Sequence, residues 1–332
     1  MSAEPRITIV IPTYKRLKYL EESIRSALAQ TVTELEVIIS DNAAMPEVRA
    51  LVEAFCDPRL RYRSNATNVG AMGNAVAAYR EARAPCVGTM HDDDTWRPDA
   101  AERLLAPLEA DVELVVAFAD YWHVTADGRV DEATSRLNSE RFGLAKLEAG
   151  VHRPFLRQAL VDESVPLAIS AVFRKDAVDW SAVRLEADHL TDRWLNYLLA
   201  RTGRGAFFVP DRLTHYRVHG TAISTSTRSQ QAVIFCLGAW LADPSLASLH
   251  SDLQRKLAEA HTLLGLDLLR LGDPVAARTA LIDALAAGGT TRARLALALA
   301  HIPARLVKPS LRTWTSRRQR QLDHLQLSRP SA

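Results

Sequence analysis

The sequence predicts an α/β protein with a mostly parallel sheet covered by helices, followed by an all-helical region. In the first half, short β-branched runs alternate with segments whose apolar residues recur at helical spacing. Helical segments of that length between strands imply right-handed crossovers and a mostly parallel sheet covered on both faces. From about Ser229 the strand patterns stop, and helical periodicity rich in leucine and alanine continues. We therefore expect one domain over residues 1–225 and a helical region over residues 226–332.

The elements of the first domain follow one another in strand–helix order. Residues 6–11 (RITIVI) form a β-branched run that ends at Pro12, which is typical of a buried strand followed by a loop. Residues 17–30 place apolar side chains at helical spacing and should cover the sheet. The same pattern predicts further strands at residues 35–40, 60–63, 86–90 and 114–118, and further helices at residues 47–55, 73–81 and 99–108.

Polar clusters follow three of these strands, where a parallel sheet binds its ligands. The first cluster is Thr13-Tyr14-Lys15-Arg16, the second is Asp41-Asn42, and the third is the acidic run His91-Asp92-Asp93-Asp94. Adjacent carboxylates raise one another's pKa unless a cation or hydrogen-bond donors neutralise them. Oxygen ligands at a strand end suit a hard divalent ion such as Mg²⁺ or Mn²⁺, although a solvated acidic turn is the alternative.

The loop after the first strand excludes two common nucleotide folds. It contains neither a Walker-type loop nor a Gly-x-Gly-x-x-Gly motif, which argues against P-loop NTPases and dinucleotide dehydrogenases. Tyr14 can instead stack on a base, and Asp41 can accept from a base N–H or a ribose hydroxyl. Taken singly, either residue is as well explained as a turn cap.

Composition limits the cellular context. Hydrophobic residues make up 48% of the chain, charged residues 24%, and the net charge is +2, as in ordinary globular proteins. The three cysteines are scattered without metal-ligand spacing, which favours a reducing compartment. Neither a signal-peptide pattern nor a membrane-spanning run of apolar residues is recognisable. We therefore expect a cytoplasmic protein without a nucleic-acid partner, which could act at the inner face of the membrane.

Several blocks together resemble family 2 glycosyltransferases. They are ITIVIPTY at residues 7–14, VIISDN at 37–42, Asn68-Val69-Gly70 with Asn74, the acidic run with Trp96 and Pro98, Asp192-Arg193-Trp194-Leu195, and Tyr216-Arg217-Val218-His219-Gly220 with Ser224. They occur in the family's order over residues 5–225. The resemblance implies a GT-A (Rossmann-like) fold, a nucleotide-diphosphate sugar donor, Mn²⁺ or Mg²⁺, and transfer with inversion at the anomeric carbon.

The same resemblance assigns roles to individual positions. Asp93 and Asp94 would bind the metal together with His219, and Asp192, near the start of a helix, would be the catalytic base. The expected donor nucleotide site consists of Pro12, Thr13, Tyr14, Arg16, Asp41, Asn68, Gly70, Asn74, Asp92 and Arg217. Asp192 has rivals in Asp188 and Glu186, and it could instead cap or salt-bridge its helix. A hydroxyl of a glycan, a lipid-linked glycan or a small molecule would be the acceptor, with UDP-sugars as the favoured donors.

Two positions depart from the family pattern. His91 stands where the family commonly has a carboxylate, and Thr191 stands where it commonly has Glu. Neither departure removes the metal pair or the candidate base. A catalytically degenerate binding or scaffold protein therefore remains an alternative to the enzyme. A nucleotidyltransferase is a second alternative, although it would need a Gly-rich, basic loop after the first strand.

The C-terminal third predicts a helical hairpin and a basic tail. Residues 253–271 and 274–287 form the expected hairpin around Gly272-Asp273-Pro274, and it resembles a single tetratricopeptide-like unit that would pack on the catalytic domain or on a partner. Basic residues then dominate, which could contact an anionic membrane, a lipid-linked acceptor or a protein, or could form a solvated basic helix. They are Arg292, Arg294, Arg305, Lys308, Arg312, Arg317, Arg318, Arg320 and Arg329.

Overall fold

The computed structural model describes residues 4–219 and 227–301, and the chain divides into two compact units, Met1–Arg217 and Val218–Ala332. The first unit contains the α/β region, and the second is helical in its described part. The expected division after residue 225 falls at residues 220–226, outside the described residues, and it stays a prediction.

The first unit is built on one sheet, in which nine strands pair within the described residues. Its first half is parallel and has the order β3-β2-β1-β4. The strands are β1 (Ile7–Thr13), β2 (Leu35–Asp41), β3 (Leu60–Ser64) and β4 (Cys86–Thr89). All four lie within a few residues of the predicted ranges, and the signal is strongest in β1 and β2, which are buried β-branched runs.

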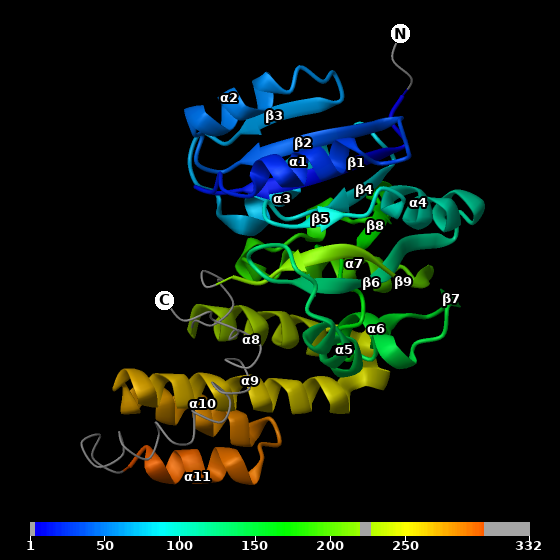
Figure 1. The fold of residues 1–332 in the computed structure, drawn as a ribbon. Helices are drawn as coiled ribbons and strands as arrows, with labels where there is room; N and C mark the ends of the chain where they lie inside the picture. The colour runs from blue at the N-terminus through cyan, green and yellow to red at the C-terminus, as the bar shows by residue number, and fades with distance from the viewer. Residues whose placement is uncertain (1–3, 220–226, 302–332) are drawn as a thin grey trace. The chain divides into compact units, whose positions relative to one another are not determined.

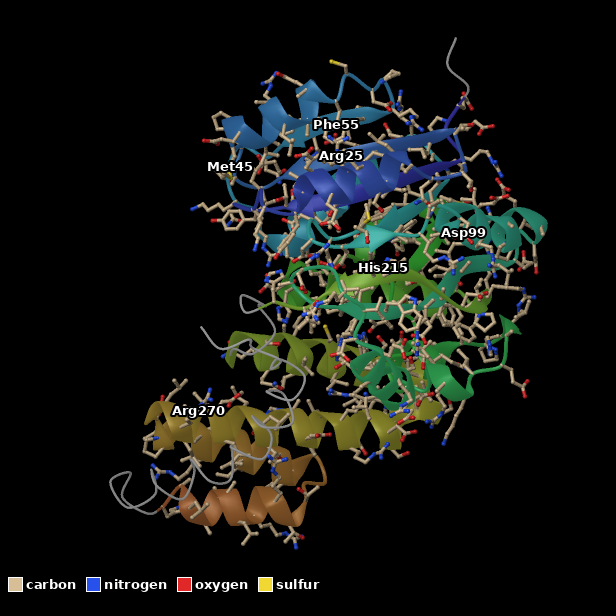
Figure 2. The ribbon with its side chains drawn as sticks, viewed as in Figure 1. Arg25, Met45, Phe55, Asp99, His215 and Arg270 are labelled. Carbon is tan, nitrogen blue, oxygen red and sulfur yellow. The ribbon has the colours of Figure 1, made fainter. Side chains whose placement is uncertain are left out.

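The second half of the sheet is mixed rather than mostly parallel, which corrects the sequence-based expectation. β8 (Ala171–Arg174) runs antiparallel to β4 and to β6 (Leu114–Val124). β9 (Gly205–Arg217) runs parallel to β6, and the short strands β5 (Thr95–Trp96) and β7 (Gly150–His152) run antiparallel to β9. Figure 2 labels His215 on β9, which pairs with Thr95 of β5. The sequence patterns indicated no strand after residue 118, so the places of β8 and β9 in the sheet were not predicted.

Helices cover both faces of this sheet (Figure 1). On one face, α1 (Leu20–Leu28), α2 (Pro46–Ala54) and α4 (Ala100–Ala110) share a core with alternate residues of β1 and β2. On the other face, α3 (Gly70–Glu81) packs beside α7 (Thr191–Ala200). The remaining helices of this unit are α5 (Glu132–Arg141), α6 (Leu156–Leu160) and short 3-10 turns at Leu144–Lys146, Lys175–Ala177, Trp180–Ala182 and Leu185–Ala187.

Two close contacts hold the first face together. Arg25 of α1 places its guanidinium 5.2 Å from the ring centroid of Phe55, just after α2, and both residues are labelled in Figure 2. In β4, a Cβ atom added at Gly88 would lie 2.6 Å from the ring of Trp96. Trp96 is 3% exposed and lies against β4, the strand that precedes the acidic run. Only glycine at position 88 leaves room for this contact.

The second unit confirms the predicted hairpin. α9 (His250–Leu271) ends at Gly272 in the left-handed conformation, and Asp273 accepts a hydrogen bond from the Ala276 backbone N–H to cap α10 (Pro274–Ala286). The unit also contains α8 (Thr227–Leu241), α11 (Thr291–Leu299) and a 3-10 helix at Pro244–Leu249.

The hairpin is covered within its own unit, because α8 packs on α9, and α11 packs on α10 and α9. Among the described residues, no single helix is long and apolar enough to cross a bilayer. One pair, Ser229–Leu241 with Pro244–Leu271, reaches the length and composition only across a bend of 110°. Of the basic residues, Arg292 and Arg294 lie on α11, and those from Arg305 onward are outside the described residues.

Candidate functional site

The ends of β1 and β2 lie side by side and bring the first two polar clusters together. Thr13 is the register partner of Asp41. The acidic run begins shortly after β4, the neighbour of β1 on its other side. The Thr13 hydroxyl donates to the Asp92 carboxylate at 2.7 Å, and Arg16 Nη1 donates to Asp92 at 3.0 Å and to Asp93 at 2.7 Å. The parallel half of the sheet therefore joins the loop after β1 to the acidic run.

The acidic run forms a compact cluster of metal-binding atoms. His91, Asp93 and Asp94 each offer one ligand atom, and these atoms lie within 4.8 Å of one another. Asp93 and Asp94 are buried, whereas the His91 side chain is 36% exposed. One imidazole nitrogen and two carboxylate oxygens are acceptable ligands for Mn²⁺. The predicted pair Asp93 and Asp94 is thus brought together, and His91, which the sequence marked only as a departure from the family, joins it.

Burial and charge act in opposite directions in this cluster. Burial raises the pKa of Asp92, although the Thr13 hydroxyl and Arg16 oppose it. Burial also raises the pKa of Asp94 against the effect of its hydrogen bond with His91. For His91, burial lowers the pKa, but the 3.0 Å hydrogen bond to Asp94 and the nearby carboxylates prevail and raise it to about 9. The cluster therefore favours a positive charge at its centre.

The second group of predicted residues lies around the end of β2. Asp41 is fully buried, and its carboxylate accepts from the backbone N–H groups of Ala43 and Met45 and from the Tyr62 hydroxyl. The Asn74 side chain binds Ser40, and that of Asn68 caps the Gly70 N–H at the start of α3. These contacts shape the loop, and a direct contact of Asp41, Asn68, Gly70 or Asn74 with a nucleotide stays a prediction.

The loop after β1 carries an exposed aromatic ring. Tyr14 is 43% exposed, and the Lys15 ammonium lies 5.3 Å from its ring centroid. Pro12 is the register partner of Ser40, so it lies within the sheet at the point where the loop begins. The Tyr14 ring is therefore accessible, and its stacking on a base stays a prediction.

Arg217 contacts the backbone of the acidic run. It is 6% exposed, and its guanidinium donates to the backbone carbonyls of Asp93 and Ala126 and to the carboxylate of Glu22. The guanidinium also lies 4.6 Å from the ring centroid of Tyr19. These partners make Arg217 a support of the acidic run, and a direct contact with the donor stays a prediction.

Asp192 lies in the first turn of α7 and is half-buried. Leu190 occupies the N-cap position without a side-chain hydrogen bond. Among the described residues, no hydrogen bond or ion pair involves the Asp192 carboxylate, so the capping and salt-bridge alternatives have no support there. Trp194, Leu195 and Leu198 are buried and hold the helix to the core, as expected.

Tyr216 connects Asp192 with the acidic cluster. Burial and the charges of Asp94, Asp93 and Asp192 raise the pKa of Tyr216 to about 12. Its ring lies 6.3 Å from that of His91. Asp192 and the carboxylates of the cluster therefore both act on the charge of the same phenol. Tyr216 belongs to the sequence block at residues 216–220, but no pattern in the sequence predicted that it lies near the acidic cluster.

His219 and Glu22 differ from the residues above: the first was predicted but is not placed at the cluster, and the second was not predicted. His219 belongs to the second unit and is not placed relative to the cluster, so its role as a metal ligand stays a prediction. Glu22 was missed, because a carboxylate on an amphipathic helix is ordinarily a solvated residue. Only its ion pair with Arg217 connects it to the site.

Comparison with known proteins identifies a domain family. Residues 8–161 match the model of glycosyl transferase family 2. The chain is similar to the chondroitin synthase of Escherichia coli, with 32% identity over 128 residues, which are 38% of this chain and 18% of that protein. The chain thus matches less than a fifth of that relative's length. Asp192, Arg217 and His219 lie beyond the matched family segment.

Solved structures share the fold. TarS 1–349 of S. aureus, in complex with UDP-GlcNAc, superposes with a TM-score of 0.63 at 16% identity, covering 98% of this chain and 93% of that one. A mannosyltransferase of Pyrobaculum calidifontis, in complex with GDP-Man and Mn²⁺, has a TM-score of 0.51 at 21% identity, covering 95% and 84%. At these identities the likeness establishes the fold, which is the predicted GT-A architecture with C-terminal helices.

Proposed function

We propose that this chain, whose residues 8–161 match the model of glycosyl transferase family 2, is a metal-dependent, inverting glycosyltransferase. It moves a sugar from a nucleotide-diphosphate donor, with UDP-sugars favoured, to an acceptor hydroxyl. The observation that carries the proposal is the cluster of His91, Asp93 and Asp94, to which Arg16, just after β1, donates a hydrogen bond.

The donor set of the cluster fits a divalent ion. Three ligand atoms within 4.8 Å of one another, one of them nitrogen, suit Mn²⁺ better than Mg²⁺, which prefers oxygen ligands. The Mn²⁺ complex of the mannosyltransferase with the same fold supports this choice. The chemistry that such an ion supplies is charge compensation for the departing nucleoside diphosphate. Whether His219 adds a further ligand belongs to this proposal.

The donor nucleotide lies along the ends of β1 and β2 in this proposal. Tyr14 stacks on the base, and the UDP-GlcNAc complex of TarS supports uridine as that base. Among the described residues only Nη1 of Arg16 is hydrogen-bonded, so its other N–H groups can donate to a phosphate. Asp92, held by Thr13, lies beside these groups and faces the ribose.

Asp192 takes the proton of the acceptor hydroxyl. The acceptor oxygen forms a bond to the anomeric carbon while the bond from that carbon to the diphosphate oxygen breaks, so the configuration inverts. The leaving nucleoside diphosphate carries the electron pair of the broken bond, and the hydroxyl proton goes to the Asp192 carboxylate. A carboxylate that no described residue hydrogen-bonds keeps its lone pairs for this purpose.

The acceptor is a hydroxyl of a glycan, of a lipid-linked glycan or of a small molecule. The polysaccharide synthase among the relatives supports a glycan. The reduced cysteines Cys56, Cys86 and Cys236 support a cytoplasmic site of action. The basic residues of the C-terminal region, from Arg292 onward, support a contact with an anionic surface that presents the acceptor.

One assay separates this proposal from its rivals. The purified chain is incubated with Mn²⁺ and a panel of UDP-, GDP- and TDP-sugars, and released nucleoside diphosphate is measured. We expect release from one donor class, and a loss of at least about 100-fold in Asp93→Asn. Pyrophosphate release from a nucleoside triphosphate and a sugar phosphate would instead indicate a nucleotidyltransferase. Absence of binding and turnover for all donors would indicate a non-catalytic scaffold.

A further inference from the structure

The backbone that carries the acidic run is held by one side of helix α1. Glu22, Ser23 and Ser26 lie within about 100° of one another around the helix axis, and Gln30 continues this stripe just after the helix ends. We call these four residues the α1 ladder. Each of them reaches, directly or through one side chain, a backbone group of residues 93–101.

The contacts follow one another along the loop. Ser23 Oγ donates to the Asp94 carbonyl at 2.8 Å in a buried position. Ser26 Oγ donates to the Trp96 carbonyl at 2.9 Å and accepts from the Trp96 N–H at 2.7 Å. Gln30 donates to the Arg97 carbonyl at 2.9 Å and accepts from the Ala101 N–H at 2.9 Å. Side chains of α1 therefore satisfy polar backbone groups along this segment, in addition to the pairing of β5 and Arg97 with β9.

Glu22 completes the ladder through Arg217. Its carboxylate accepts from Arg217 Nη2 at 2.7 Å, and Arg217 Nε donates to the Asp93 carbonyl at 2.9 Å. The Arg217 backbone N–H also donates to the Asp94 carboxylate at 2.8 Å. The Arg217 side chain is 4% exposed, so its charge needs a partner, and Glu22, at 54% exposure, supplies one from the solvent side.

We propose that the α1 ladder positions the carboxylates of Asp93 and Asp94 for metal and donor binding, and that Glu22 is a positioning residue of the site. The proposal rests on the function proposed above. Metal ligands depend on the groups that orient them, and loss of such a group typically weakens metal affinity about 10–100-fold. Arg217 and Ser23 hold the carbonyls of Asp93 and Asp94, so the ladder holds the backbone from which both carboxylates project.

The chain offers a matched control one residue away. Glu21 lies on the same helix, is exposed, and pairs only with Arg25 among the described residues, at 2.7 Å. Glu21→Gln and Glu22→Gln therefore remove the same charge from the same helical turn, but only the second affects Arg217. Ser26→Ala is a second, uncharged test, since it removes both hydrogen bonds to Trp96.

The first readout is hydrogen–deuterium exchange of the peptide that spans residues 91–101 in the full chain. We expect exchange to be about tenfold faster in Glu22→Gln and in Ser26→Ala, and unchanged in Glu21→Gln. The second readout is Mn²⁺ affinity by titration calorimetry without donor. We expect the Kd to rise about tenfold in Glu22→Gln and not in Glu21→Gln. Circular dichroism confirms that each variant is folded.

The two readouts separate two kinds of failure. If the wild-type chain binds no Mn²⁺ and turns over no donor, the proposed function is wrong, and the exchange rates alone decide whether the ladder holds the loop. If Glu22→Gln and Ser26→Ala exchange at the wild-type rate, or if Glu22→Gln binds Mn²⁺ as tightly as Glu21→Gln does, the positioning role is refuted. In turnover, a positioning role raises KM for the donor more than it lowers kcat.

Discussion

Replacing His123 by Phe should remove a large part of the loss of stability on acidification. His123 lies on β6, is 8% exposed, and its Nδ1 atom is buried without a hydrogen-bond partner among the described residues. Burial lowers its pKa from 6.5 to about 4, although Asp131 and Asp120 raise it and Arg212 lowers it further. Phe retains the ring contacts with Tyr121 and Tyr216, whose centroids lie 5.4 and 5.5 Å away.

The sign and size of the effect follow from proton binding. The imidazole is neutral in the folded chain and becomes protonated in the unfolded chain as the pH falls through 6.5, so the unfolded state binds more protons between pH 6.5 and 4. The resulting loss of unfolding free energy is about 2 kcal/mol at pH 5 and approaches about 3 kcal/mol well below pH 4. Above pH 6.5 the histidine contributes no pH dependence.

Urea denaturation of wild type and His123→Phe at pH 7.5 and at pH 5 measures this loss of unfolding free energy. We expect the unfolding free energy of His123→Phe minus that of wild type to be about 2 kcal/mol larger at pH 5 than at pH 7.5, so that the variant gains relative stability at low pH. Groups such as Asp92 and Asp94 titrate in both proteins and cancel in the difference. A wild type and a variant that lose the same free energy between the two pH values would refute a buried, neutral His123.

Three further predictions concern the base, the β4 contact and the helical hairpin. Asp192→Asn should lower kcat about 10²–10⁴-fold while the Kd for nucleoside diphosphate, measured by calorimetry, stays within twofold, and an unchanged kcat would exclude it as the base. Gly88→Ala should cost about 1–3 kcal/mol in urea denaturation because its Cβ would lie 2.6 Å from the Trp96 ring. Gly238→Ala, with no atom within 4 Å of its Cβ, is the control that should not lose stability. Asp273→Ala should cost about 1 kcal/mol through loss of the N-cap of α10, and equal thermal unfolding of variant and wild type would contradict the capping role.

The parallel half of the fold was predictable because its signals are local. Each of β1, β2 and β4 is a buried β-branched or apolar run that ends at a polar cluster, and the helices between them show apolar periodicity. The hairpin of α9 and α10 was equally clear, since Gly272, Asp273 and Pro274 are strong helix-stop and helix-start signals. The antiparallel place of β8 was not, because strand direction depends on contacts with β4 and β6, far along the chain.

By itself, the sequence determined which elements and side chains the first unit offers: an α/β scaffold, carboxylates after β4, a tyrosine after β1 and a carboxylate at the start of α7. These follow from residue types and spacings that act within a few positions of the chain. The tertiary structure alone decided which groups work together. It paired His91 with Asp94, placed the buried Arg217 against the backbone of the acidic run, and connected Glu22 to that run through Arg217. Such contacts depend on the packing of β9 and α1 around the loop. The residues involved are separated by more than 100 positions in the case of Arg217 and Asp93, and no periodicity or motif encodes a distance of that kind.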